Sequence, residues 1–516
     1  MAPRRFVALV VGGAALLAAC GADAAVTADR ADTIGFVAVP GQPPPSTVPS
    51  PAGPTTPDAS TPDVTPAPTP TSSVPADPAA IDFGPAKPAK DYDAFLLGVM
   101  TDLQAWWSEE YPAIYGEPYR RLEGAVYAAY PDRPDDIPGC GSASTTYQEV
   151  QQYVAFYCGV GDFMVYDDSD DGLLAELARD HGPGTIGTVF AHEFGHAIQL
   201  RSGALDRSLA TILTEQQSDC FAGAWTGRVA RGESPTIRYS DADVRAGLIA
   251  MTKVSDPVGV DQFVEGGHGS GFDRVGAFQV GFTGGPARCA DILDNPLPLV
   301  PNRFTSLDDQ NSLGNAPFGY GSKDLLGFLP NDLNLYWDTQ LAAEIPAMGP
   351  LRLVVVRTPA DITCTDLRGD LARGAALCPS TGEVLVDEQA ALDLYQSHGD
   401  FAVGYLIGIA WSEAVQEASG STLTGEARAL VNDCLTGGWV QTVILVDTPL
   451  GLDLPRPRAE GRTSSASAGD LDEAIQTVLL VADVGKDDNL VGNAFEKIAA
   501  LRTGVIEGTA ACLAQI

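Results

Sequence analysis

The stretch TIGTVFAHEFGHAIQL, Thr185 to Leu200, determines the fold of the first half of this chain. Small and apolar residues surround two histidines, which predicts a helix buried on most sides. His192 and His196 stand four residues apart, so on a helix they project from one face, about 40° apart and one turn above the other. Two imidazoles placed in this way can bind one tetrahedral Zn²⁺ ion.

The sequence also supplies a general base beside the first histidine. Glu193 follows His192 and is expected to face a water molecule held by the metal. Zinc lowers the pKa of such a water, and a carboxylate takes its proton as it attacks a carbonyl. The alternative is a pair of surface histidines on a helix, which the apolar neighbours Phe190 and Ile198 disfavour. The chain has only 5 histidines, so this pattern rarely arises by accident.

A catalytic zinc site needs a third protein ligand and an open fourth position. Gln199 and Ser202 exclude the class in which H-E-x-x-H continues to a third histidine. Glu215 lies 19 residues after His196 on a second predicted helix, and Asp219 follows one turn later. This E-x-x-x-D looks like the thermolysin-type arrangement, which implies that Glu215 binds zinc and that Asp219 accepts a hydrogen bond from a ligand histidine. In the alternative, Asp219 is the ligand and Glu215 is solvated.

Together these motifs resemble a bacterial family of neutral zinc metallopeptidases. Its members read close to H-E-x-G-H-x-x-Q and E-L-Q-A-D-C-x-A-G-x-W. This chain has HEFGHAIQ from His192 and EQQSDCFAGAW from Glu215, within a similar region from about Asp91 to Leu293. The triplet at His268 agrees as well. The resemblance implies an α+β, zincin-like, predominantly helical domain that hydrolyses peptide bonds with zinc.

The C-terminal part of the chain repeats the first part. Residues 404–420 align without a gap with residues 187–203, and DCLTGGW at 433–439 matches DCFAGAW at 219–225. The chemical residues do not recur. The positions of His192, Glu193, His196 and Glu215 hold Ile409, Ala410, Glu413 and Ala429. The sequence therefore predicts a tandem duplication whose second copy lacks the zinc ligands.

The repeat also separates the other histidines. His268 aligns with Val491, so it is lost together with the metal ligands. We therefore expect His268 in the active site, as a hydrogen-bond donor to the developing oxyanion. His181 and His398 have no such support and are expected at the surface.

Eight cysteines follow the first hundred residues, and an even number in an exported chain predicts disulfides. Each copy has four cysteines in equivalent places, so pairing within each copy is the simplest arrangement. The expected bonds are Cys140–Cys158, Cys220–Cys289, Cys364–Cys378 and Cys434–Cys512.

The N-terminus predicts export and a lipid anchor. Two arginines precede the apolar stretch 6–19, which is too short to span a bilayer and reads as a signal peptide. The residues LAAC at 17–20 resemble a bacterial lipobox, so Cys20 is the expected lipidation site, on the outer face of the bacterial cytoplasmic membrane. An ordinary signal peptide with a chance cysteine is the alternative. Residues 41–80 are almost wholly Pro, Thr, Ser, Ala and Asp, which is typical of an extended tether.

The formal net charge of −36, with 67 acidic and 31 basic residues, argues against nucleic acid as a partner, because phosphate binding needs a basic surface. The expected partners are a peptide or protein substrate, the membrane through the N-terminal lipid, and an envelope protein for the second domain. The expected segments are a signal peptide 1–19, a lipidated cysteine and tether 20–90, a zinc metallopeptidase domain 91–295, a linker 296–330 and a degenerate domain 331–516.

Three functional interpretations remain open at this stage. The first is the zinc peptidase, for which all three ligands are present. The second is a catalytically weak or inactive binding or scaffold lipoprotein of the cell envelope, which the degenerate second copy makes credible. The third is a cell-wall amidase that uses the same zinc chemistry.

Overall fold

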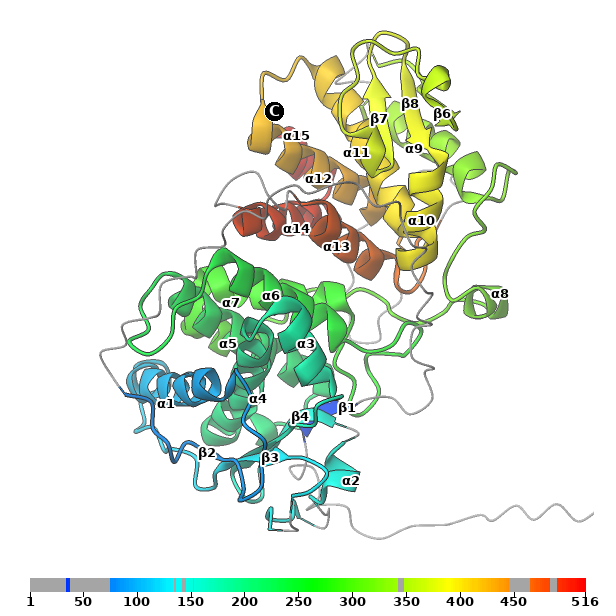
Figure 1. Cartoon of the computed structure of the whole chain (residues 1–516). Coiled ribbons are helices and arrows are strands. Elements are labelled where there is room, and N and C mark those ends of the chain that lie inside the picture. Colours follow the sequence, from blue (N-terminus) through cyan, green and yellow to red (C-terminus); the bar gives the residue numbers. More distant parts are fainter. Residues whose placement is uncertain are drawn as a thin grey trace, which may run out of the picture.

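The computed structural model describes residues 75–133, 136–141, 145–151, 153–341, 348–444, 465–482 and 490–516. For residues 34–37, 340, 341 and 490–493 only the backbone is described. The expected signal peptide, the lipidation site Cys20 and most of the tether lie outside the described residues. The described chain mixes helices with small sheets, so the α+β class is confirmed (Figure 1).

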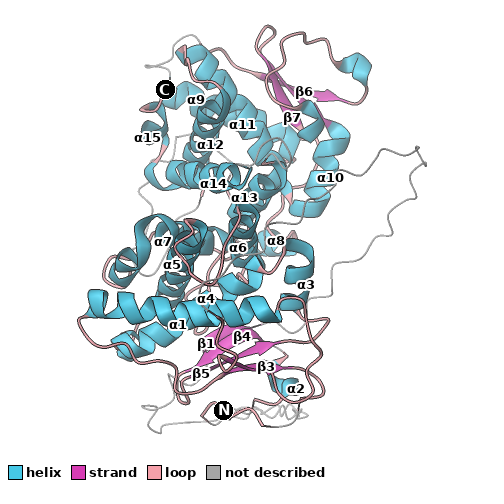
Figure 2. Ribbon diagram, turned by 60° about the vertical axis from the view of Figure 1, so that its left-hand side comes forward, coloured by secondary structure: helices cyan, strands magenta, loops and turns pink. Residues whose placement is uncertain are grey.

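The first half places a five-stranded sheet beside a layer of helices, with α1 lying across them (Figure 2). The sheet order is β1-β4-β5-β3-β2; β3 is parallel to β5 and β2, whereas β4 is antiparallel to β5 and β1. The helices expected around the histidine motif and the acidic motif are present as α4 and α5. The elements are β1 (Ile34–Val37), β2 (Ile81–Asp82), α1 (Asp93–Tyr115), β3 (Val126–Ala129), α2 (Tyr147–Val150), β4 (Tyr153–Cys158), β5 (Phe163–Asp167), α3 (Leu173–His181), α4 (Gly184–Ser202), α5 (Thr211–Ala230), α6 (Asp241–Lys253) and α7 (Gly271–Asp291).

The second half has the same order of elements around a three-stranded sheet. In the order β6-β8-β7, the outer strand β6 is parallel to the central strand and β7 is antiparallel to it, as in β3-β5-β4. Helix α9 precedes these strands, as α1 precedes β3, and helices α10 to α14 follow them, as α3 to α7 follow β5. The elements are α8 (Leu307–Asn311), α9 (Leu325–Leu341), β6 (Arg352–Val356), β7 (Ala375–Cys378), β8 (Glu383–Asp387), α10 (Glu388–His398), α11 (Asp400–Ser419), α12 (Gly425–Gln441), α13 (Asp470–Val481), α14 (Leu490–Glu507) and α15 (Thr509–Leu513).

Glycines allow the closest helix crossing in each half. A Cβ atom on Gly281 would lie 1.8 Å from the carbonyl oxygen of Cys220, which is why α7 can touch the backbone of α5. In the second half, a Cβ atom on Gly504 would likewise lie 1.9 Å from the carbonyl oxygen of Cys434. The disulfide Cys220–Cys289 joins α5 to α7 directly, whereas Cys434–Cys512 joins α12 to α15, the short helix that follows α14. The two halves therefore share a packing detail as well as an order of elements.

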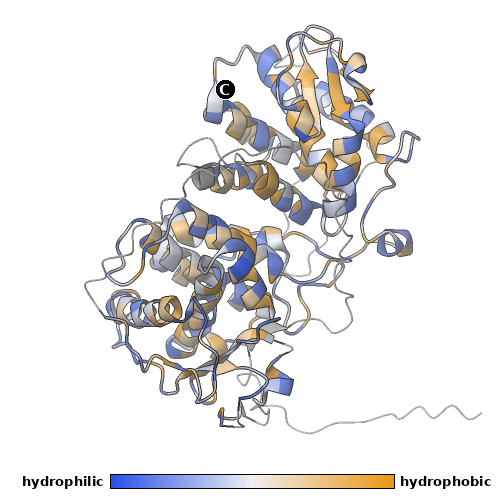
Figure 3. Cartoon of the chain, in the orientation of Figure 1, coloured by the Kyte–Doolittle hydropathy of each residue, from blue (hydrophilic) through white to orange (hydrophobic). Residues whose placement is uncertain are grey.

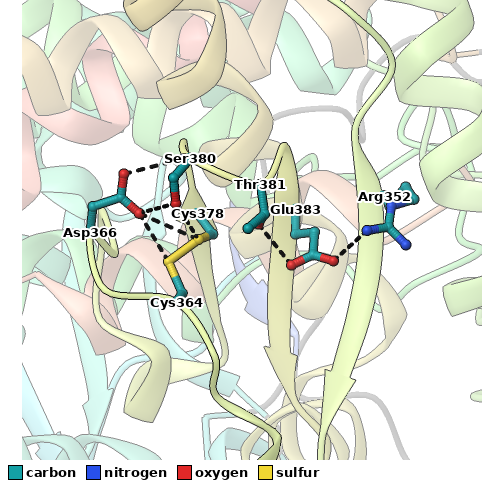
Figure 4. The surroundings of a disulfide bond; sticks show 7 residues. All are labelled: Arg352, Cys364, Asp366, Cys378, Ser380, Thr381 and Glu383. Atoms are coloured by element: carbon teal, nitrogen blue, oxygen red, sulfur yellow. Dashed lines mark hydrogen bonds and ion pairs between the residues drawn. A yellow bond between two sulfur atoms is a disulfide. The ribbon is translucent and has the colours of Figure 1, made fainter.

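All four expected disulfides are present in the structure. Figure 4 shows the bond between Cys364 and Cys378, where Asp366 accepts hydrogen bonds from the hydroxyl and backbone N–H of Ser380. Such bonds indicate an extracellular or otherwise oxidising compartment. Among the described helices, none is both long and apolar enough to cross a membrane.

The expected start of globular sequence near Asp91 lies too late in the chain. Ile81 is 3% exposed and pairs in parallel with β3, and Lys87 places its ammonium 3.0 Å from a carboxylate oxygen of Asp168. Strand β1 likewise adds to the sheet from within the expected tether, 20–90. These segments were missed because a two-residue strand and buried ion pairs leave no apolar periodicity.

The expected linker 296–330 is also more structured than its Pro and Gly content suggested. Leu299 is fully buried against the first half, and helix α8 follows it. Helix α9 begins at Leu325, five residues before Pro330, which lies inside the helix. At this sixth position of the helix the proline cannot donate to the carbonyl oxygen of Leu326, so α9 gives up one helical hydrogen bond there. In Figure 3 apolar residues gather on the strands and the helices around them, whereas α8 is mostly hydrophilic.

The two halves form one packed body. A single hydrophobic cluster runs through both of them. Asp472 at the start of α13 accepts hydrogen bonds from the backbone N–H groups of Gly271 and Phe272, at 2.9 and 2.7 Å, and so caps α7 of the other half. The guanidinium of Arg502 lies 4.2 Å from the ring centre of Phe272 and donates to its carbonyl oxygen. Two helices of the second half, α13 and α14, thus hold the N-terminus of α7.

Candidate metal centre

Helices α4 and α5 bring the candidate ligands together. They approach closely at Gly195, where a Cβ atom would lie 2.3 Å from the hydroxyl oxygen of Ser218. That hydroxyl donates to the carbonyl oxygen of His192. A larger residue at Gly195 would push the two helices apart, and the ligands of α4 would lose their partner on α5.

The imidazole Nε2 atoms of His192 and His196 lie 3.1 Å apart. The two carboxylate oxygens of Glu215 lie 3.2 Å from the first ring and 3.4 Å from the second. All three side chains are at most 1% exposed. Asp219 is not part of this converging set, so the geometry favours Glu215 over Asp219 as the third ligand.

The other ring nitrogens are occupied by hydrogen bonds that orient the imidazoles. His192 Nδ1 lies 2.7 Å from a carboxylate oxygen of Asp219, and His196 Nδ1 lies 2.9 Å from the side-chain oxygen of Gln199. The amide of Gln199 in turn donates to the carbonyl oxygen of Thr214, at 2.7 Å. With both Nδ1 atoms engaged, both Nε2 atoms are left to face the centre, as histidine ligands require.

Arg274 is a contributor whose role the sequence did not reveal. Its guanidinium donates to both carboxylate oxygens of Asp219, at 3.0 and 2.7 Å, and to the carbonyl oxygen of Val254 at 2.6 Å. Asp219 therefore forms hydrogen bonds with both Arg274 and His192. The available signal was the repeat, in which Lys497 takes the place of Arg274 and a cation is retained.

The electrostatics of the centre follow from deep burial of several ionisable groups. Burial raises the pKa of Glu193 to about 8. Burial also lowers the pKa of His196 to about 4, whereas the carboxylates of Asp219 and Glu215 outweigh burial at His192 and raise its pKa to about 9. The histidine charges, His196 first, overcome burial at Glu215 and lower its pKa. A buried site of this composition favours a bound cation over protons alone.

Unsatisfied polar atoms give an independent test of whether a metal fits. Both carboxylate oxygens of Glu193 and Oε2 of Glu215 are buried without a hydrogen-bond partner among the described residues. Buried polar groups normally have partners. A metal ion held by His192, His196 and Glu215, with water beside Glu193, would satisfy them. The residues therefore fit a metal ion, and the donor set of two imidazoles and one carboxylate suits a divalent one.

His268 lies near this centre but is held by another residue. Asp256 accepts from the backbone N–H of His268 at 2.8 Å, and its other oxygen lies 3.3 Å from the ring Nδ1. The charge of His268 is among the causes that lower the pKa of Glu215. Of the two histidines expected at the surface, His181 is exposed and His398 is partly buried.

The corresponding region of the second half has different chemistry. Glu413, at the position of the second histidine, accepts hydrogen bonds from Arg428 at 2.7 Å and from Asn432 at 2.8 Å. Asp433 accepts from Lys497 at 2.6 Å and from the hydroxyl of Tyr405. The polar atoms there satisfy one another, and no metal-binding group is found among the described residues of α11 and α12 at this position.

Comparison with known proteins leaves the family open. No family model and no solved structure matches the chain. Similar proteins are found in Mycobacterium bovis and in two strains of Mycobacterium tuberculosis, each described as an uncharacterized protein. Each is 33% identical over 175 residues, which cover 29% of this chain and 57% of the relative. The chain thus spans little more than half the length of these relatives.

Proposed function

We propose that this protein is a zinc-dependent peptidase of the neutral metallopeptidase type that its motifs resemble. The observation that carries the proposal is the converging set of His192, His196 and Glu215, with the partnerless carboxylate of Glu193 beside it. If the cluster had only a structural role, the carboxylate of Glu193 would stay buried without a partner, which is strongly disfavoured in free energy.

Zinc bound there supplies a Lewis acid that polarises the substrate carbonyl and lowers the pKa of a water molecule. The carboxylate of Glu193 accepts a proton from the attacking water, whose oxygen bonds to the carbonyl carbon. His268 donates a hydrogen bond to the oxygen that gains negative charge. The C–N bond then breaks, and Glu193 returns the proton to the leaving amine. Asp219 keeps the His192 ring oriented during these steps, and Arg274 keeps Asp219 in place.

The sheet supports a peptide as the substrate. Strand β4 contributes Tyr157, whose backbone is among the causes that act on the pKa of Glu193. The outer edge of β4 binds an extended segment, because β1 pairs there in antiparallel fashion, with Ile34 opposite Tyr157. Main-chain pairing of this kind binds peptides largely independently of their side chains. A substrate peptide that took the place of β1 on this edge would run past the general base, which favours peptide bonds over the amide bonds of cell-wall glycans.

We further propose that the two halves arose by tandem duplication and that the second copy now serves the first as a support. The matching order and directions of three strands in each sheet, the paired glycine crossings and the Asp433–Lys497 contact favour this origin. Export and the lipid anchor at Cys20 remain part of the proposal, with the disulfides as supporting observations. An envelope protein as a partner of the second half has no support beyond the sequence.

The test replaces the general base and leaves the ligands intact. Glu193→Gln should keep about one zinc per chain and lose peptide cleavage by at least about 10²-fold, the usual contribution of a positioned base. Zinc is measured by elemental analysis, and cleavage with a panel of fluorogenic peptides and peptidoglycan fragments. Glu176→Gln, an exposed acid on α3, is the matched control. Full activity in the Glu193 variant, or no zinc in the folded wild type, would reject the proposal.

A further inference from the structure

A second cluster of acidic side chains lies in the other half of the molecule, far along the chain from the histidines. Asp400, Asp470 and Glu473 each offer a carboxylate oxygen within 4.8 Å of the other two. Asp400 is the first residue of α11, and Asp470 is the first residue of α13. The proposed peptidase chemistry uses none of these groups.

Each carboxylate is anchored through one oxygen to a backbone N–H group. Oδ2 of Asp400 accepts from Ala316, Oδ2 of Asp470 accepts from Ser467, and Oε2 of Glu473 accepts from Phe401, each at 2.8 Å. Three separate segments therefore hold the carboxylates together. This geometry is built by the fold and is not an accidental gathering of flexible surface acids.

The remaining oxygens indicate a missing partner. Oδ1 of Asp400 and Oδ1 of Asp470 are buried and have no hydrogen-bond partner among the described residues. The two residues are only 7% and 5% exposed. The backbone at Gly399 closes over the third acid, because a Cβ atom there would lie 2.0 Å from Oε1 of Glu473. Gly399 has a positive φ of 97°, which allows this close approach.

No cation in the described chain neutralises the cluster. None of the three acids forms an ion pair with a described lysine, arginine or histidine; each instead has an acidic neighbour among the causes that raise its pKa. The N-termini of α11 and α13 contribute partial positive charge only, equivalent to about half a charge each. Three buried carboxylates so close together need more compensation than this.

We propose that Asp400, Asp470 and Glu473 bind a calcium ion that fastens the N-termini of α11 and α13 to the segment at Ala316. Calcium is favoured because every donor is a hard oxygen and neither histidine nor cysteine belongs to the cluster. Calcium also accepts irregular carboxylate geometry, whereas Mg²⁺ requires a near-ideal octahedron and keeps its waters. The site is independent of the proposed zinc centre, which uses imidazole nitrogens.

The bound ion would also act at a distance through α13. That helix begins with Asp470 and carries Asp472, which caps α7 of the first half. Fixing the start of α13 therefore fixes the cap of α7. Calcium would consequently stabilise the contact between the two halves as well as the second half itself.

The test uses the full chain, freed of metal and then reloaded with zinc alone. Addition of Ca²⁺ should raise the melting temperature by about 2–4 °C at ten times the dissociation constant, which for exported proteins is about 10⁻⁴ to 10⁻³ M. Terbium luminescence should report binding at the same place and be displaced by Ca²⁺. Unchanged melting in the folded wild type, or an equal shift with Mg²⁺, would overturn the assignment.

Two variants distinguish a bound calcium ion from the alternative, a proton shared among the three carboxylates. Asp470→Asn keeps the shape of the side chain and its bond to Ser467 but removes one buried charge. It should raise the melting temperature without calcium, and it should abolish the calcium response while leaving zinc content at about one per chain. Glu473→Gln is the second variant should the first not fold, and exposed Asp393→Asn is the control. A calcium response that survives in both variants, or a proton-dependent stability with no calcium response, would refute the site.

Discussion

The cap that Asp472 provides for α7 makes a sharp prediction about communication between the two halves. The carboxylate of Asp472 accepts two backbone hydrogen bonds, from Gly271 and Phe272. Asp472→Ala leaves both N–H groups buried without a partner. Each such loss costs about 1–3 kcal/mol. Relief from burying the charge, which raises the pKa of Asp472 to about 6, offsets part of this cost. We expect a net fall in the free energy of unfolding of about 2 kcal/mol.

The same substitution should also lower the zinc affinity of the candidate metal centre. Helix α7 carries Arg274 one turn after the capped residues, and Arg274 holds Asp219, which orients His192. Outer contacts of metal ligands typically change affinity by about 10–100-fold when removed. Because Asp472→Ala only loosens such a contact, we expect zinc affinity to fall by less than that, about threefold to tenfold.

Denaturant titration and a competitive zinc chelator measure the two effects separately. Asp393→Ala, an exposed acid on α10, is the control and should change neither quantity. Unchanged zinc affinity with reduced stability would show that the halves share stability only, and would refute the coupling through α7. Unchanged stability would refute the cap itself.

Three further predictions follow from named contacts. Gly281→Ala forces a methyl group against the carbonyl oxygen of Cys220 and should lower the free energy of unfolding by at least about 1–3 kcal/mol, whereas Gly349→Ala, in open space, should be neutral by thermal unfolding. Arg274→Lys keeps a charge but loses the paired hydrogen bonds, so zinc affinity in chelator competition should fall by about tenfold, and an unchanged affinity would contradict the role assigned to it. Burial raises the pKa of Asp273 from 3.8 to about 8, so the folded state binds its proton more tightly than the unfolded state, and this group makes stability fall as pH rises from about 4 to 8. Asp273→Asn should flatten that part of the pH–stability curve, and a curve of unchanged slope would refute the shift.

The sequence predicted the centre of the site well because its signals are local. The spacing of His192 and His196 depends only on helix geometry, and Glu215 lies on the next helix, joined by a short connection. Arg274 carries no comparable local signal, because its contact with Asp219 depends on how α7 crosses α5. That crossing depends on Gly281, whose importance appears only when the two backbones are placed together.

The errors lay at the boundaries of the domains. Composition marked residues 296–330 as a linker, yet Leu299 is buried and α9 begins at Leu325. The start near Asp91 was set by the first amphipathic helix, whereas Ile81 already belongs to the sheet. Short edge strands and single buried leucines carry little periodic signal, so only tertiary contacts reveal them.

The acidic cluster at Asp400 shows why the second half is more than a relic. At the position that corresponds to the second histidine, Glu413 accepts a hydrogen bond from Arg428, so the polar groups of the second half have partners there. The unsatisfied carboxylates of the second half lie instead at Asp400 and Asp470, at the starts of α11 and α13. If the second half arose by duplication, as we propose, it can stabilise the first half through specific contacts without taking part in catalysis. The capping of α7 by Asp472 is such a contact, because it acts on the one helix whose guanidinium holds Asp219. Weakening the junction with the second half is therefore expected to lower the zinc affinity of the first half, so the halves should not behave as separable modules.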